Sequence, residues 1–102
     1  MTEGGRACAS IGLMPELSRF QGIVIRMFAE AGGGHHIPHF HAYYQGRAAG
    51  FTFNPVECIG GWIPAPQARL VQDWAAHRRS ELDEAWSRLD SGRSPEPIAP
   101  LP

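Results

Sequence analysis

Residues 39–53 read HFHAYYQGRAAGFTF, and two runs rich in aromatic residues flank the pair Gly46-Arg47. Aromatic side chains are typical of strands, and a glycine between two strand-like runs is a turn signal. The segment therefore predicts a β-hairpin with strands over about residues 39–45 and 48–53.

The residues on both sides of this hairpin extend the predicted sheet. Residues 20–29 read FQGIVIRMFA, which is rich in β-branched and aromatic side chains and too short for a typical helix. We expect one strand there. After the hairpin, Asn54-Pro55 breaks the strand, and residues 56–59 form a brief candidate fourth strand.

The second half of the chain has a helical pattern from about Pro66 to Leu89. A proline suits the first turn of a helix, and Gly92 follows its end. With 100° per residue, one side of this helix collects Leu70, Val71, Trp74, Ala75, Leu82, Ala85, Trp86 and Leu89. The predicted fold class is therefore α+β: a small antiparallel sheet of three to four strands packed against one long C-terminal helix.

The chain length of 102 residues suits a single domain. Residues 1–13 are small and glycine-rich without any period, which predicts a disordered leader. Met14 is an alternative start, from which the leader would not be translated. We expect the α+β domain over residues 14–94 and an extended proline-rich tail over 95–102.

Composition excludes several classes of protein. The formal net charge is −1, which gives no support to nucleic acid as the main partner. The chain has neither an apolar run of about 18 residues nor a signal-peptide pattern, so we expect a soluble, cytoplasmic protein without membrane contacts. Two cysteines build neither a disulfide framework nor a four-thiolate zinc site.

Histidines are concentrated just before the predicted hairpin. Four of the five lie within residues 35–41, in the run HHIPHFH. On a strand, the alternation of side chains places His39, His41 and Tyr43 on one face. Pro38 stiffens the segment that carries His35, so the three histidines are candidates for one site.

Three interpretations of this cluster stay open. His35, His39 and His41 have a spacing that suits a divalent transition metal such as zinc or nickel. His39 and His41 could instead be catalytic, as the general acid and base acting on a phosphodiester or another substrate. Strand histidines also hydrogen-bond the backbone and each other, or contact a partner.

Two arginines complete the candidate binding residues, which are His35, Arg26, Arg78 and Tyr43. Arg78 falls near the middle of the apolar helix side. It therefore has to reach solvent, pair with Glu57 or another buried carboxylate, or contact a substrate anion. Arg26 reaches the histidines only if the strand register allows it. Trp74 and Trp86 are better explained as core residues.

Several motifs occur in an order that resembles the small bacterial family called domain of unknown function 4160. They are MPELSRF at 14–20, GIVIRM at 22–27, PHFHA at 38–42, DWA at 73–75, EAW at 84–86 and PIAPL at 97–101. The most specific element is Pro-His-Phe-His after an isoleucine-rich strand. The resemblance implies a helix histidine at the position of Arg78, where this chain departs from the family.

The resemblance also implies a partner, because genes of this family are often found beside those of another small domain of unknown function. We therefore expect a binding module that acts with a genetically linked small protein, as in a toxin–antitoxin pair, through a histidine-lined strand face. The alternatives are a nuclease-like or other phosphate-processing effector that uses His39 and His41, and a transition-metal-binding protein.

Overall fold

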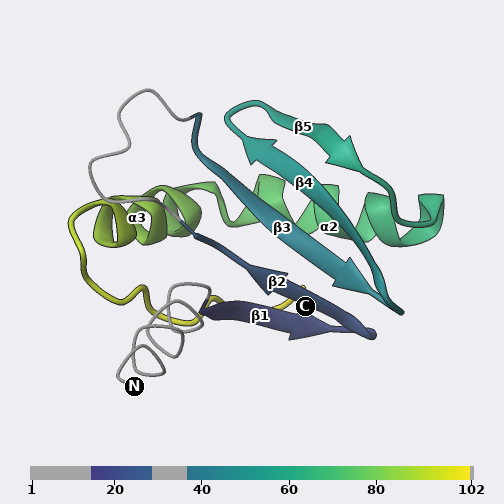
Figure 1. Ribbon diagram of the computed structural model, residues 1–102, viewed down its shortest axis with the longest axis horizontal. Coiled ribbons are helices and arrows are strands. Elements are labelled where there is room, and N and C mark those ends of the chain that lie inside the picture. Colours follow the sequence, from purple (N-terminus) through teal and green to yellow (C-terminus); the bar gives the residue numbers. More distant parts are fainter. Residues whose placement is uncertain (1–14, 29–36, 102) are drawn as a thin grey trace, which may run out of the picture.

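The computed structural model describes residues 15–28 and 37–101. Its elements are β1 (Glu16–Phe20), β2 (Ile23–Arg26), β3 (His39–Tyr44), β4 (Arg47–Phe53), β5 (Val56–Gly61), α2 (Ala65–His77) and α3 (Arg79–Asp90). The strands form one antiparallel sheet in the order β1-β2-β3-β4-β5. Figure 1 shows α2 and α3 along one side of it. The α+β class and the antiparallel sheet are confirmed, whereas the expected three to four strands and single long helix are wrong in number.

The additional strand comes from a turn inside the segment predicted as one strand over 20–29. Gln21 and Gly22 have φ values of 49° and 81°, and they connect β1 to β2. Gln45 and Gly46, with φ values of 48° and 78°, connect β3 to β4 in the same way. Two-residue turns with positive φ match the twist of antiparallel strands, so both pairs close tight hairpins.

Strand β5 is longer than the segment 56–59 and contains an irregularity. Gly50 pairs with Gly60, whereas Phe51 pairs with Cys58, so Ile59 is the additional residue of a bulge. The strand ends at Gly61, which has a φ of 72° and a backbone pressed against the Ala48 carbonyl. A side chain at position 61 would collide with that carbonyl.

The core lies between the sheet and the helices. Phe40 and Phe51 face each other across β3 and β4 with ring centroids 5.6 Å apart. Trp74 of α2 is fully buried, and its ring meets Phe40 edge-on at 5.6 Å. Most of the predicted apolar helix side is buried as expected, namely Val71, Trp74, Ala75, Leu82, Ala85 and Leu89. Leu70 and Trp86 are only partly buried.

The predicted long helix is divided at Arg78, whose φ of −114° and ψ of 23° lie outside the helical region. The C-terminal tail provides the physical reason. Arg78 donates from Nε to the Ala99 carbonyl at 3.2 Å and from Nη2 to the Pro100 carbonyl at 2.9 Å. Bonds to carbonyls 21 and 22 residues away hold this residue where the helix changes direction.

The tail itself packs on the domain as an extended segment. The Ile98 amide donates to the Leu17 carbonyl of β1 at 2.7 Å, and the Ile98 side chain is buried. Trp74 Nε1 donates to the Ala99 carbonyl at 2.8 Å. The tail therefore covers part of the β1 side of the core. The predicted leader over residues 1–13 lies outside the described residues.

No helix in the described part of the chain is long and apolar enough to span a membrane.

Candidate functional site

The candidate histidines lie on the side of β3 that faces away from the core. Phe40 and Ala42 are buried in the core, so the alternation of the strand turns His39, His41 and Tyr43 to the other side. The neighbouring strands add residues in register with them. We call the surface formed by Val24, Arg26, His39, His41, Tyr43, Gly50 and Ile59 the histidine face.

His39 is held in one orientation. Its Nδ1 lies 2.8 Å from the Ile37 carbonyl oxygen. A carbonyl only accepts, so Nδ1 carries the proton and donates it, and the neutral ring has its lone pair on Nε2. The His39 ring also meets Trp86 of α3, with ring centroids 5.6 Å apart. Trp86 therefore borders the histidine face as well as the core, whereas the sequence predicts only a core position for it.

His41 is half-buried, and its environment favours the neutral ring. Burial lowers the pKa of His41, and the neighbouring His39 lowers it further. Its Nδ1 is buried and has no hydrogen-bond partner among the described residues. Gly50 lies opposite His41 on β4, where a Cβ atom would sit 3.6 Å from Cδ2 of the ring. The absence of a side chain at position 50 keeps this side of His41 uncrowded.

Strand pairing brings two other candidate residues to the same face. Arg26 is in register with His41 across β2 and β3, and Tyr43 follows His41 with ring centroids 6.3 Å apart. Arg26 also faces Glu16 across β1. A hydrogen bond from Arg19 lowers the pKa of Glu16, and the charge of Arg26 adds to the effect. The register therefore places Arg26 between an acidic residue and the histidines.

Arg78 does not join this group. It binds the tail carbonyls described above, and its Nη1 lies 3.9 Å from Glu81 in the next helical turn. Of the alternatives for Arg78, pairing with Glu57 is not the one observed, because the arginine binds backbone carbonyls of the tail and lies near Glu81. His35 lies outside the described residues. Within residues 15–28 and 37–101, no three or more His, Cys, Asp or Glu side chains are grouped to hold a metal ion.

Ile59 is a residue of this face that the sequence pattern does not indicate. Its side chain reaches within 3.7 Å of where a Cβ atom of Gly50 would lie, on the side of His41, and 54% of it is exposed. Alternation along β5 does not reveal this placement, because the bulge shifts the register at Ile59. The sequence signal for Ile59 is that it is a large aliphatic residue between Glu57-Cys58 and Gly60-Gly61.

Two hollows in the described part of the chain lie elsewhere, along α3 and the tail. The smaller, of about 150 Å³, is lined by Glu81, Glu84, Ala85, Arg88, Glu96, Pro97 and Ile98. The other is lined by Ser80, Asp83, Glu84, Ser87, Arg88 and Arg93. Neither is lined by a histidine.

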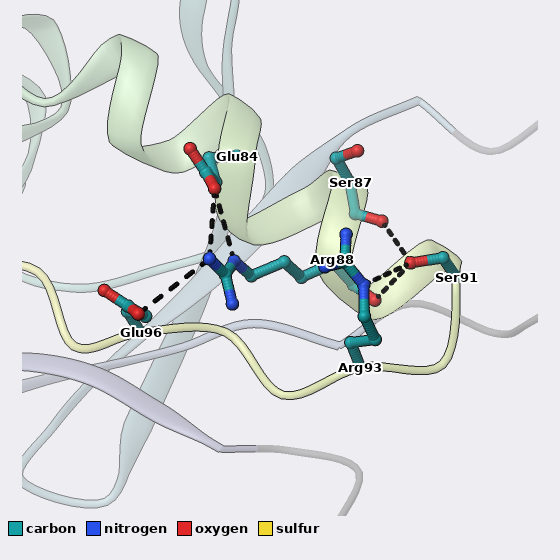
Figure 2. A network of polar contacts seen from close by, with 6 residues as sticks. All are labelled: Glu84, Ser87, Arg88, Ser91, Arg93 and Glu96. Carbon is teal, nitrogen blue, oxygen red and sulfur yellow. Dashed lines mark hydrogen bonds and ion pairs between the residues drawn. The ribbon is translucent and has the colours of Figure 1, made fainter.

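Arg88 lines both hollows, and Figure 2 shows its polar contacts. It donates to Glu84 at 3.2 and 3.3 Å and lies 3.8 Å from Glu96 of the tail. Its contacts are those of a structural cation that holds the tail against α3.

Comparison with known proteins identifies the family without adding a characterised activity. Neither the curated proteins nor the solved structures contain a match to this chain. One family model, described as domain of unknown function (DUF4160), matches residues 22–87. The match runs from β2 to α3 and includes the histidine strand, as the resemblance of the motifs implies. The chain therefore belongs to the DUF4160 family.

Proposed function

We propose that this protein is a binding module that docks a small protein partner on the histidine face, and that the partner is encoded nearby, as in a toxin–antitoxin pair. One observation carries the proposal. In the described part of the chain, α2 packs on the opposite side of the sheet, and α3 meets the histidine face only at its edge, where Trp86 contacts His39. The histidine face itself collects aromatic and apolar side chains.

The chemistry of this face suits a protein interface. His41, Tyr43 and Ile59 offer ring and aliphatic surface, and Arg26 is a charged residue at the margin. Interface centres are poor in charged residues and rich in aromatic ones, with arginine frequent among the residues that contribute most. An exposed isoleucine beside half-buried rings therefore favours contact with another protein surface.

The shape of the molecule favours docking over catalysis. Enzymes enclose their substrates in concave sites lined by the reacting groups. Two hollows formed by the described residues lie along α3 and the tail, and neither is lined by a histidine. The two histidines stand on a strand whose neighbour opposite His41 is a glycine. This arrangement supports a surface that another molecule covers.

The test is co-expression with the product of the adjacent gene, followed by affinity purification, gel filtration and calorimetric titration. Ile59→Arg puts a charge beside His41 and should weaken binding by at least about tenfold. Trp62→Arg is the matched control. Trp62 is also exposed, but its ring stacks under Arg47, on the side of β4 opposite the histidine face. We expect this variant to bind like the wild type.

Two results would overturn the proposal. One is equal binding by the Ile59→Arg and Trp62→Arg variants, or no complex at all. The other is hydrolysis of a phosphodiester such as bis-p-nitrophenyl phosphate by the purified chain, lost in His39→Phe and His41→Phe variants. That second result would favour the phosphate-processing alternative.

A further inference from the structure

The two histidines of β3 lean toward each other more than the strand alone requires. Alternate residues of an extended strand are about 6.6 to 6.8 Å apart. The ring centroids of His39 and His41 are 5.3 Å apart, with the ring planes 83° to each other. The two rings are therefore in edge-to-face contact on the same side of the strand.

That separation is compatible with two imidazoles bound to the same ion. Zinc–nitrogen bonds of about 2.0–2.1 Å and a tetrahedral angle place the centres of two imidazole rings about 5.2 Å apart. The observed centroid distance of 5.3 Å agrees with this value.

The hydrogen bond of His39 leaves one of its ring nitrogens available for a metal. Its Nδ1 donates to the Ile37 carbonyl, which fixes the lone pair on Nε2. Histidine ligands in proteins commonly donate their other ring nitrogen to a backbone carbonyl or a carboxylate, which fixes the tautomer and the ring orientation. Ile37 would have this supporting role.

His41 has a ring nitrogen without a hydrogen-bond partner. Its buried Nδ1 finds no partner among the described residues, and a buried polar atom without a partner calls for an explanation. An ion bound at Nδ1 would give this nitrogen the partner it lacks. Gly50 adds no side chain beside Cδ2 and Nε2 of the ring, and the Ile59 side chain borders this space.

We propose that His39 and His41 chelate one divalent transition-metal ion on the histidine face, with His39 bound through Nε2. Imidazole nitrogens suit zinc, nickel and copper and suit magnesium poorly, because magnesium requires oxygen ligands. Two protein ligands leave coordination positions for water or for a donor of a bound molecule. This site requires only the isolated chain, so it does not rest on the docking proposal.

The test is calorimetric titration of the purified, chelator-treated full chain with Zn²⁺, and with Mg²⁺ as the hard-ion comparison. We expect one Zn²⁺ per chain and no heat of binding with Mg²⁺. His39→Phe and His41→Phe keep the ring contacts and remove the nitrogens, and each should weaken Zn²⁺ binding at least tenfold. His77→Phe is the matched control. His77 is exposed on α2 with its Nδ1 bonded to the Asp73 carbonyl, and this variant should bind like the wild type.

A second measurement identifies the ligating nitrogen. Long-range ¹H–¹⁵N spectra of the histidine rings should show Nε2 of His39 shifting on addition of Zn²⁺ while its Nδ1 stays protonated. Should either phenylalanine variant fold poorly, the corresponding glutamine variant takes its place. Undiminished Zn²⁺ binding by the folded double variant would overturn the proposal, because the ion would then be held elsewhere. Absence of Zn²⁺ binding by the wild type would also overturn it.

Discussion

Trp74 should be the residue whose loss costs the fold most. Its side chain is fully buried, its ring lies 5.6 Å from Phe40 and 5.7 Å from Phe20, and its Nε1 donates to the Ala99 carbonyl. Replacing a buried tryptophan by alanine costs about 3–5 kcal/mol. Each lost aromatic pair and the lost hydrogen bond favour the upper part of that range, since each contributes about 0.5–1.5 kcal/mol. We therefore expect Trp74→Ala to lower the free energy of unfolding by about 4–5 kcal/mol.

A loss of that size is measurable and discriminating. Small domains have a free energy of unfolding of about 5–15 kcal/mol, and about 4 kcal/mol lowers Tm by roughly 15–30 °C. Urea unfolding followed by circular dichroism gives the difference without relying on tryptophan fluorescence. Trp62→Ala is the control, because Trp62 is 58% exposed and its main contact is Arg47, 4.9 Å above the ring. That contact contributes about 0.5–1 kcal/mol. Equal losses in the two variants, or a loss below about 1 kcal/mol for Trp74→Ala, would refute this account of the core.

The remaining predictions concern a titration, a turn and the tail. Burial lowers the pKa of His41, so on acidification the unfolded chain binds a proton at this residue before the folded chain does. In the presence of chelator, the free energy of unfolding should therefore decrease as the pH drops below about 6.5, and it should decrease less in His41→Phe. If the urea midpoint decreases equally in the wild type and in His41→Phe between pH 7.5 and 5.5, His41 is excluded as the source of the pH dependence. Gly61→Ala should destabilise by about 2 kcal/mol or more in thermal melts, because φ is 72° and the new Cβ meets the Ala48 carbonyl. Gly60→Ala, with open space around it, should cost less than about 0.5 kcal/mol, and a similar cost for both would contradict the argument. Arg78→Met should cost about 1–3 kcal/mol and speed hydrogen exchange at the tail amides, and unchanged exchange would show that the tail holds without this arginine.

Local patterns in the sequence were sufficient for the central hairpin and for the apolar side of the helices. Both depend on residues close together in the chain, such as Gln45 and Gly46 at the turn. The sequence does not reveal the same type of turn at Gln21-Gly22, because this turn interrupts an apolar run and glutamine seldom adopts positive φ. Nor does it reveal the division of the helix at Arg78. Neither glycine nor proline marks this break in the helix. It depends on hydrogen bonds from Arg78 to the C-terminal tail, more than twenty residues away in the sequence.

The candidate site, like the fold, was predictable where it depends on local sequence patterns and not where it depends on strand pairing. The common face of His39, His41 and Tyr43 follows from the two-residue period of a strand alone. The position of Arg26 depends on the register between β2 and β3, which a sequence leaves open. Ile59 depends on a bulge in β5 and could not be placed from alternation. The histidine face is therefore a product of both local periodicity and long-range pairing.

Docking and metal binding involve the same histidines but can be tested separately. A chelate of two imidazoles leaves part of the coordination sphere open, and a donor atom of a docked protein is one group that can complete it. If the partner completes the sphere, chelator should weaken the complex, and His39→Phe should weaken it as much as chelator does. If docking depends only on ring and aliphatic contacts, chelator leaves the affinity unchanged, His39→Phe is nearly neutral because the ring remains, and Ile59→Arg still disrupts the complex. The affinity of the complex in zinc and in chelator thus decides whether the ion belongs to the interface or only shares its surface.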